Sequence, residues 1–322
     1  LSVQGACSKI GAVTGKGLAA LIKENYSKKM LYLALFLVVV ANIVNIGADF
    51  GAMAATLQLL VPSASFTAAV IGFAAVILGL ELFVPYKKYA KILKWLAVVL
   101  FAYPITAFVV GQPWGQVLVD TLNPTRVHFD FQVIMIMVGL IGTTISPYLF
   151  FWDTSEVVED EITHKRLGLN RLHAPKITRH FLRNVWLDNI VGMTLAAMTA
   201  WFIMVVCATV LNSHGVTEIN TAADAASALE PLVQGFPNAG LVAKLIFSVG
   251  ILGTGLLAIP VLAGSCSYAI AEAFGWKEGL SRKVKKAKGF YLVIVLATVV
   301  GLLINFTGIN PIQALVWAAV VN

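Results

Sequence analysis

The residues best suited to chemistry lie between Gly142 and Pro147, in the segment Gly-Thr-Thr-Ile-Ser-Pro. Pro147 has no amide hydrogen, and its ring clashes with the carbonyl four residues earlier in a continuous helix. Gly142 lowers the cost of irregular backbone at the same place. The carbonyls that such a break frees, together with the hydroxyl of Ser146, are oxygen donors that can bind a cation. The same segment also fits an ordinary proline kink, and local chemistry alone does not separate the two interpretations.

A second polar group precedes it, because Asn42, Asn45 and Asp49 follow one another at helical spacing within an apolar segment. On a helix these three side chains share one face. A charged side chain at the centre of a bilayer costs about 2.5–3.5 kcal/mol on insertion scales, so Asp49 is expected to face a cavity or a partner. A structural hydrogen bond to a neighbouring helix would explain Asp49 equally well.

Other acidic residues near the ends of apolar segments have simpler interpretations. Glu81 can extend towards water from a helix end. Glu272, near Lys277, and Asp188, near Arg183, are expected to act as counterions or helix caps. We therefore assign no chemistry to these three.

The composition indicates that membrane-spanning helices carry these groups. The 322 residues are 59% hydrophobic and 12% charged, whereas a soluble domain has about 45–50% apolar residues and about 25% charge. About 20 apolar residues cross the hydrocarbon layer as a helix, which satisfies its own backbone hydrogen bonds. We expect an all-α polytopic membrane protein, with residues 1–322 forming a single transmembrane transport domain truncated at both ends. The predicted spans are 30–60, 65–84, 92–111, 131–155, 185–211, 239–273, 290–307 and 311 to the end.

The charge of the connections supports this threading. All but two of the 23 Lys and Arg residues lie in residues 1–30 and in the second, fourth and sixth connections, which share one side. The exceptions are Arg126 and Lys244. By the positive-inside rule the basic side is cytoplasmic, and residues 1–29, which are expected to form a polar leader, lie on it. We expect a multi-pass protein of a plasma membrane, such as the bacterial inner membrane.

No motif of a soluble enzyme is present in the sequence: there is no P-loop, no HExxH and no G-x-S-x-G. Cys7, Cys207 and Cys266 have no metal-knuckle spacing. The net charge of +7 is explained by topology and contact with the lipid bilayer, without a nucleic-acid partner. We therefore expect neither an enzyme nor a bound cofactor.

Four stretches resemble the Nramp family of divalent metal transporters. Residues 41–60, 142–161, 247–276 and 309–322 are similar to parts of its third, sixth, eighth and tenth helices. The resemblance covers nearly the whole chain. It implies a LeuT-like inverted-repeat fold of the APC superfamily, of which this sequence carries helices three to ten and lacks the first two.

The resemblance also implies a metal site shared by two unwound helices, the first of which precedes Leu1. In the sixth helix, Thr143 would supply its carbonyl, and Ser146 stands where the family has a methionine. Pro147 is kept, Tyr148 replaces one histidine, and Asp153 falls where a second histidine is usual. Metal ligands are thus expected at Thr143 and Ser146. A substrate pathway is expected along Gly142, Thr144, Pro147, Tyr148, Asp153, Asp49 and Asn45.

These departures favour a hard cation. Oxygen ligands suit Mg²⁺, Ca²⁺ and Mn²⁺, whereas a thioether favours softer metals. Asp49 matches an acid of the family, but Ala52 replaces its glutamate, which removes a proton carrier. The sequence thus looks like the Nramp-related branch associated with Mg²⁺, and we expect transport of Mg²⁺ and/or Mn²⁺ by alternating access with weak or no proton coupling. A proton-coupled Mn²⁺/Fe²⁺ symporter and an amino-acid permease of the same fold are the alternatives.

Overall fold

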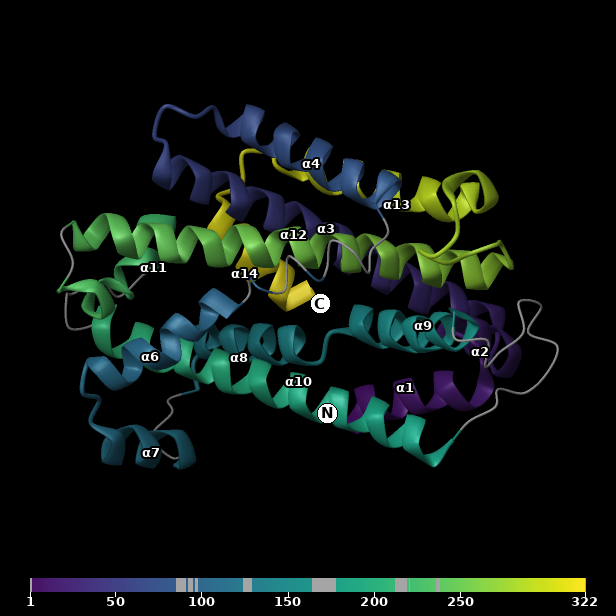
Figure 1. The fold of residues 1–322 in the computed structure, drawn as a ribbon, viewed down its shortest axis with the longest axis horizontal. Helices are drawn as coiled ribbons and strands as arrows, with labels where there is room; N and C mark the ends of the chain where they lie inside the picture. The colour runs from purple at the N-terminus through teal and green to yellow at the C-terminus, as the bar shows by residue number, and fades with distance from the viewer. Residues whose placement is uncertain are drawn as a thin grey trace.

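The computed structural model describes residues 2–84, 91, 95, 98–123, 129–163, 178–211, 219, 221–235 and 238–321, and this part of the chain is helical and without strands (Figure 1). The longer helices are α1 (Ser2–Thr14), α2 (Leu18–Asn25), α3 (Lys28–Leu60), α4 (Phe66–Phe83), α6 (Ala102–Val109), α7 (Trp114–Leu122), α8 (Phe131–Thr144), α9 (Pro147–Thr163), α10 (Arg179–Val206), α12 (Ala239–Phe274), α13 (Lys288–Ile304) and α14 (Pro311–Val321). Shorter pieces are η1 (Val98–Phe101), η3 (Cys207–Leu211), α11 (Ala222–Ser227), η4 (Glu230–Val233) and η5 (Val284–Lys286).

Helices α3 and α12 form the centre of the bundle, and α13, α14 and α4 pack around α3. Ser27 caps the start of α3 by accepting the Met30 amide at 3.3 Å. The C-terminal end of α12 is capped by Gly275, whose φ of +71° is a left-handed conformation that glycine adopts without a Cβ clash. The largest core cluster includes Phe50, Met53 and Ile259 and is made mostly by these helices. The two longest apolar segments of the sequence thus become the axis of the fold.

Small residues bring α3 and α13 into close contact. A Cβ placed on Gly301 would lie 2.5 Å from Cγ2 of Ile46 and 3.2 Å from the amide nitrogen of Gly47. Such proximity is typical of helix pairs in membranes, where packing replaces the hydrophobic effect as the driving force.

We expect Gly301→Ala to destabilise the protein, because the added methyl group overlaps Ile46, and overpacking typically costs about 1–3 kcal/mol. The matched control is Gly72→Ala on α4, where a Cβ meets nothing within 4 Å and the better helix propensity of alanine should be neutral or stabilising. Thermal unfolding in detergent measures both. Equal melting temperatures for the two variants would contradict tight packing at Gly301.

The predicted spans are confirmed in large part. In the part of the chain that the structure describes, five helical stretches are long and apolar enough to cross a membrane: Lys28–Leu60, Phe66–Phe83, Val133–Ile162, Arg179–Leu211 and Ala239–Phe274. The bent pair Val98–Val109 and Trp114–Leu122 would be a sixth if it counts as one span. Helices α13 and α14 are shorter apolar helices at the positions of the last two predicted spans. Two boundaries were wrong: the fourth span continues to Thr163, and the fifth begins at Arg179. The inverted-repeat relation of the helices stays a prediction.

The third predicted span, 92–111, differs most from the structure. Residues 98–109 form η1 and α6, and the chain then turns by 116° into α7, which the sequence analysis did not anticipate. The turn contains Gly111 at a φ of +68°, followed by Gln112 and Pro113. Residues 92–94, 96 and 97 lie outside the described part of the chain.

Residues 2–25 were wrongly interpreted as a polar leader. They form α1 and α2, and α1 lies against α9 and α10 (Figure 1). A Cβ on Gly11 would lie 2.6 Å from the carbonyl oxygen of Thr154, so glycine permits this approach. Because Ala12 and Ser8 are fully buried as well, the small residues of α1 form its packing face.

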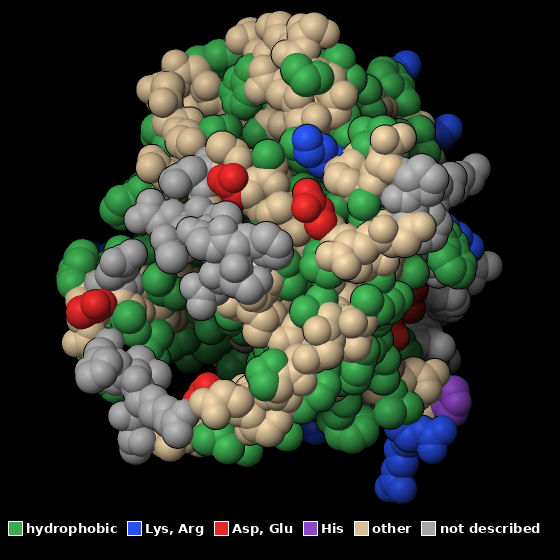
Figure 2. Space-filling view, turned by 90° about the vertical axis from the view of Figure 1, so that its left-hand side faces the viewer, with side chains coloured by type: hydrophobic (Ala, Val, Ile, Leu, Met, Phe, Trp, Pro, Cys, Tyr) green, Lys and Arg blue, Asp and Glu red, His purple; other side chains and the backbone are tan. Residues whose placement is uncertain are grey.

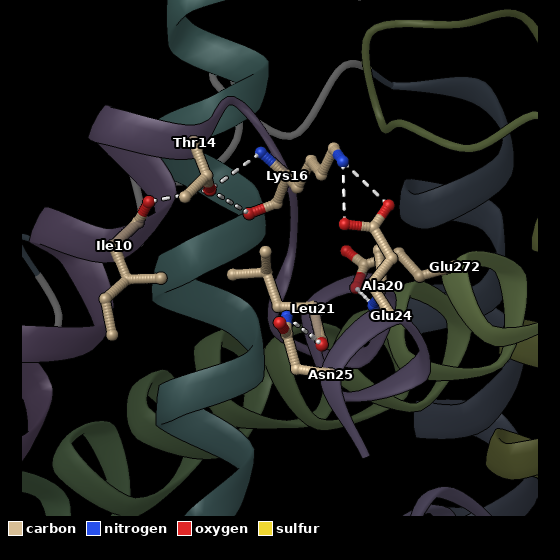
Figure 3. A network of polar contacts seen from close by, with 8 residues as sticks. All are labelled: Ile10, Thr14, Lys16, Ala20, Leu21, Glu24, Asn25 and Glu272. Carbon is tan, nitrogen blue, oxygen red and sulfur yellow. Dashed lines mark hydrogen bonds and ion pairs between the residues drawn. The ribbon is translucent and has the colours of Figure 1, made fainter. Parts of the chain in front are cut away.

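Glu272 joins three helices and is not simply a counterion of Lys277. Its Oε2 accepts the backbone amides of Ala19 and Ala20, at 3.0 and 3.3 Å, and so caps the start of α2. Its Oε1 accepts the hydroxyl of Ser155 at 2.7 Å. Figure 3 shows Glu272 beside α2, close to the exposed Lys16–Glu24 salt bridge of 2.7 Å. A residue near the end of α12 therefore fixes the position of α2 against α9.

Glu81 also differs from the prediction, because it does not extend towards water. It is only 5% exposed, and neither carboxylate oxygen has a hydrogen-bond partner among the described residues.

The ends of the bundle differ in charge. Helix α2, the end of α9, the start of α10 and the connection from α12 to α13 lie at one end, on the right of Figure 1. This end contains most of the described Lys and Arg residues. Figure 2 faces the opposite end, with the α3–α4 turn and α11, where hydrophobic and uncharged groups predominate and few basic side chains are visible. This asymmetry agrees with the threading inferred from the connections.

Candidate cation site

The predicted break in the helix is present, and it consists of Ile145 and Ser146. Helix α8 ends at Thr144, and α9 begins at Pro147, the position where a missing amide hydrogen costs nothing. Ser146 between them is 1% exposed, and its hydroxyl lies 2.8 Å from the carbonyl oxygen of Thr143 and 3.2 Å from that of Gly142. The two predicted ligands are therefore in direct contact. The Ser146 oxygen keeps acceptor lone pairs while it donates its proton, so it can still bind a cation.

Helices α12 and α3 enclose the start of α9. The Ser265 hydroxyl donates to the Tyr148 carbonyl oxygen at 2.9 Å. The Tyr148 hydroxyl interacts with the side chain of Ser146 and lies within electrostatic range of Asp49 on α3. The structure thus brings Ser146, Tyr148 and Asp49 together from two helices that are about a hundred residues apart in the sequence.

The predicted ligand Thr143 and the predicted pathway residues Thr144 and Asn45 do not join this cluster through their side chains. Thr143 and Thr144 are exposed, and their hydroxyls donate hydrogen bonds to the carbonyl oxygen of Leu140 in the preceding turn, at 3.0 and 2.7 Å. Asn45 donates to the Ala41 carbonyl of its own helix at 3.0 Å. A role for Thr143 therefore depends on its backbone carbonyl, as predicted.

Asn42, the first residue of the polar stripe, has a structural contact. It is fully buried and donates to the Leu262 carbonyl of α12 at 3.1 Å. Its Oδ1 has no hydrogen-bond partner in the described parts of the chain. The residues of this stripe therefore have different surroundings: Asn42 joins α3 to α12, whereas Asp49 lies near the break.

Asp153 faces a different space. A cavity of about 460 Å³ lies between α1, α9 and α10, and acidic residues from two of these helices line it: Asp153, Glu156, Asp160 and Asp188. The amides of Gln4 and Asn189 complete its polar lining. Several carboxylates around one cavity lower the local electrostatic potential and concentrate cations there.

Side chains of α1 and α10 hold Asp153 at the edge of this cavity. The Ser8 hydroxyl donates to Asp153, and Asn189 donates to Ser8 at 2.6 Å. Burial raises the pKa of the nearby Cys7 thiol, and the negative charge of Asp153 raises it further. Burial and the nearby carboxylate thus disfavour the thiolate form of Cys7, which is the form that binds metals.

The sequence analysis missed most of this acidic lining, although a signal was present. Asp153, Glu156 and Asp160 are spaced i, i+3 and i+7, which places them on one helical face. The contributions of Gln4 and Asn189 had no local signal, because they come from helices distant in the sequence.

The ligand types at the break are consistent with a weakly held ion. Among the described residues, no group of three or more His, Cys, Asp or Glu side chains is placed to hold a metal. The donors that surround the break are hydroxyl and carbonyl oxygens with one nearby carboxylate, Asp49. Such a set suits a hard cation that keeps part of its water shell.

The full length of the sequence, residues 1–322, matches the family model described as natural resistance-associated macrophage protein-like, or Nramp. This chain belongs to the Nramp family. Two relatives are each 23% identical to it and are named divalent metal cation transporter MntH, from Verminephrobacter eiseniae and Brucella suis biovar 1. The alignments cover 99% and 97% of this chain but 66% of each relative. The chain therefore spans just under two thirds of the length of these Nramp proteins, and the resemblance noted in the sequence is confirmed.

Proposed function

We propose that this Nramp chain forms the main part of a transporter that moves divalent cations, Mg²⁺ and/or Mn²⁺, by alternating access with weak or no proton coupling. The observation that carries the proposal is the helix break, where the hydroxyl of Ser146 stands beside the carbonyl of Thr143. The names of the relatives support the class of substrate. The oxygen donors at the break support the choice of hard ions within that class.

The acidic cavity supports a cation over an organic anion. Its carboxylates lie on the face of α9 that follows the break and on α10. A hydrated divalent ion carries two positive charges and is attracted to this space more strongly than a zwitterionic amino acid, whose ammonium is attracted but whose carboxylate is repelled. The permease alternative is therefore the weaker one.

The remaining alternative, a proton-coupled Mn²⁺/Fe²⁺ symporter, differs from this proposal in its proton coupling. Asp49 beside Tyr148 is a carboxylate at the break and provides one group able to carry a proton. Tyr148 occupies a histidine position of the family and Ala52 occupies its glutamate position, and the loss of these two proton carriers favours the uncoupled version.

Uptake into liposomes that contain the full-length protein tests the proposal. We expect flux of Mg²⁺ and Mn²⁺ well above that of protein-free liposomes, with Cd²⁺ carried poorly because the site offers no sulfur. A pH-sensitive dye in the same vesicles should report little proton movement. Strong Cd²⁺ flux without Mg²⁺ flux would refute the hard-ion assignment, and stoichiometric proton entry would establish the coupled symporter instead.

A further inference from the structure

A second cavity lies at the basic end of the bundle, beneath the connection between α12 and α13. Its volume is about 330 Å³. Its polar lining comes from α9, from the end of α12 and from the connection itself, which contributes Arg282, Lys283 and Lys286. None of the roles proposed for the helix break or for the acidic cavity involves this space.

The three basic side chains lie towards the rim of the cavity. Lys283 and Lys286 are exposed, and Arg282 is partly exposed. Their charged groups have no ion-pair partner among the residues that the structure describes. Three neighbouring cations that form no ion pair repel one another, and an anion bound between them relieves that repulsion.

The acidic residues of the same cavity lie deeper in the fold, and among the described residues none of them forms an ion pair with Arg282, Lys283 or Lys286. Glu159 accepts the hydroxyl of Tyr268 and the amides of Leu280 and Ser281, at 3.1 and 2.5 Å for the two amides. Glu272, 6% exposed, caps α2 and binds Ser155 as described above. Glu278 is 8% exposed. The cavity therefore has an acidic floor and a basic rim.

An aromatic pair indicates the depth of this rim relative to the membrane. Phe274 and Trp276 follow the end of α12, are 54% and 44% exposed, and stack with ring centroids 5.5 Å apart. The indole also packs on Gly289 at the start of α13, where a Cβ would lie 2.7 Å from the ring. Exposed tryptophan is typical of the level of the lipid headgroups. The basic rim directly follows this pair in the chain, so it lies at headgroup level.

We propose that this cavity binds the phosphate of an anionic phospholipid, with Arg282, Lys283 and Lys286 holding the phosphate oxygens and the Phe274–Trp276 pair lying against the glycerol and upper acyl region. The guanidinium of Arg282 can form two parallel hydrogen bonds to a phosphate, and the lysines add compact charges. A soluble phosphate shares the headgroup chemistry, but it would gain nothing from the exposed aromatic pair. The position of that pair is the reason for choosing a lipid.

Lipid binding to the full-length protein in detergent, followed by native mass spectrometry, tests the proposal. We expect phosphatidylglycerol to bind at least about tenfold more tightly than phosphatidylcholine, because each basic residue near an anionic headgroup contributes several-fold. The variant R282Q/K283Q/K286Q should lose this preference. The matched control K277Q/K285Q/K288Q removes the same number of charges from the same connection, but at exposed positions outside the cavity, and should keep the preference.

The outcomes separate the alternatives. Equal losses in the two triple variants would overturn the proposal in favour of a diffuse electrostatic attraction. Displacement of bound lipid by inorganic phosphate alone, at concentrations comparable with the lipid, would assign the cavity to a soluble anion and would also overturn it. If the cavity variant is poorly folded, the single variant Lys286→Gln, at an exposed side chain, takes its place and should weaken phosphatidylglycerol binding several-fold. Unchanged binding by that variant would count against the site, whatever the transport assay shows.

Discussion

Replacement of Ser146 by methionine is expected to shift the metal preference of the transporter towards Cd²⁺, raising the Cd²⁺ to Mg²⁺ flux ratio by about tenfold or more. Ser146 is 1% exposed at the break and contacts the Thr143 carbonyl at 2.8 Å, so its side chain lies where the proposed ligands converge. A thioether there provides a soft donor and removes a hard one. Uptake of both ions into the same liposome preparation gives the ratio directly.

The matched control for this experiment is Ser146→Leu, which has nearly the volume of methionine but no sulfur. Both substitutions overpack a buried position, so both should lower total flux to a similar degree. Only the methionine variant should favour Cd²⁺. If the leucine variant shows the same shift in ratio, the effect comes from shape, and Ser146 is not a metal ligand.

Removal of the Glu272 carboxylate by Glu272→Ala is expected to destabilise the protein by about 3 kcal/mol or more. The substitution leaves the amides of Ala19 and Ala20 and the hydroxyl of Ser155 without their acceptor in a buried place. It also leaves a cavity where the side chain was packed. Thermal unfolding in detergent, followed by fluorescence-detected size exclusion, measures the loss as a lower melting temperature.

Glu24→Ala is the control, because Glu24 also belongs to the α2 region but forms only a solvent-exposed salt bridge with Lys16. Exposed pairs of this kind contribute roughly 0–1 kcal/mol, so this variant should unfold close to the wild type. Gly17→Ala gives an independent check, since a Cβ there would lie 1.6 Å from Oε1 of Glu272 and must displace it. A wild-type melting temperature in both Glu272→Ala and Gly17→Ala would show that the contact does not hold α2 in place.

Features of this protein that depend on local chemistry were predictable from its sequence. The break at Ser146 was predictable because proline and glycine act on the backbone within one helical turn. The long apolar spans were predictable because hydrophobic length alone decides whether a helix can cross a bilayer. The role of Asp49 in the substrate pathway stays a prediction.

The features that sequence analysis missed all involve contacts between distant segments. Helix α1 looked like a polar leader because its packing face is made of Gly11, Ala12 and Ser8, which give no hydrophobic signal. The partners of Asp153 come from the beginning of the chain and from α10, 145 residues away in the case of Ser8. Glu272 was expected to be a counterion or a helix cap, but the helix that it caps begins about 250 residues earlier, which the sequence did not indicate.

The sequence by itself therefore determined that this is a helical membrane protein of the Nramp type, with a basic end and a broken helix rich in oxygen donors. Tertiary structure alone decided which carboxylates face a cavity, which ones hold helices together, and that Asp49 lies within electrostatic range of Tyr148 at the break. The physical reason is that backbone breaks and hydrophobic length are local properties. The surroundings of a buried polar group, in contrast, are set by whichever helices pack against it.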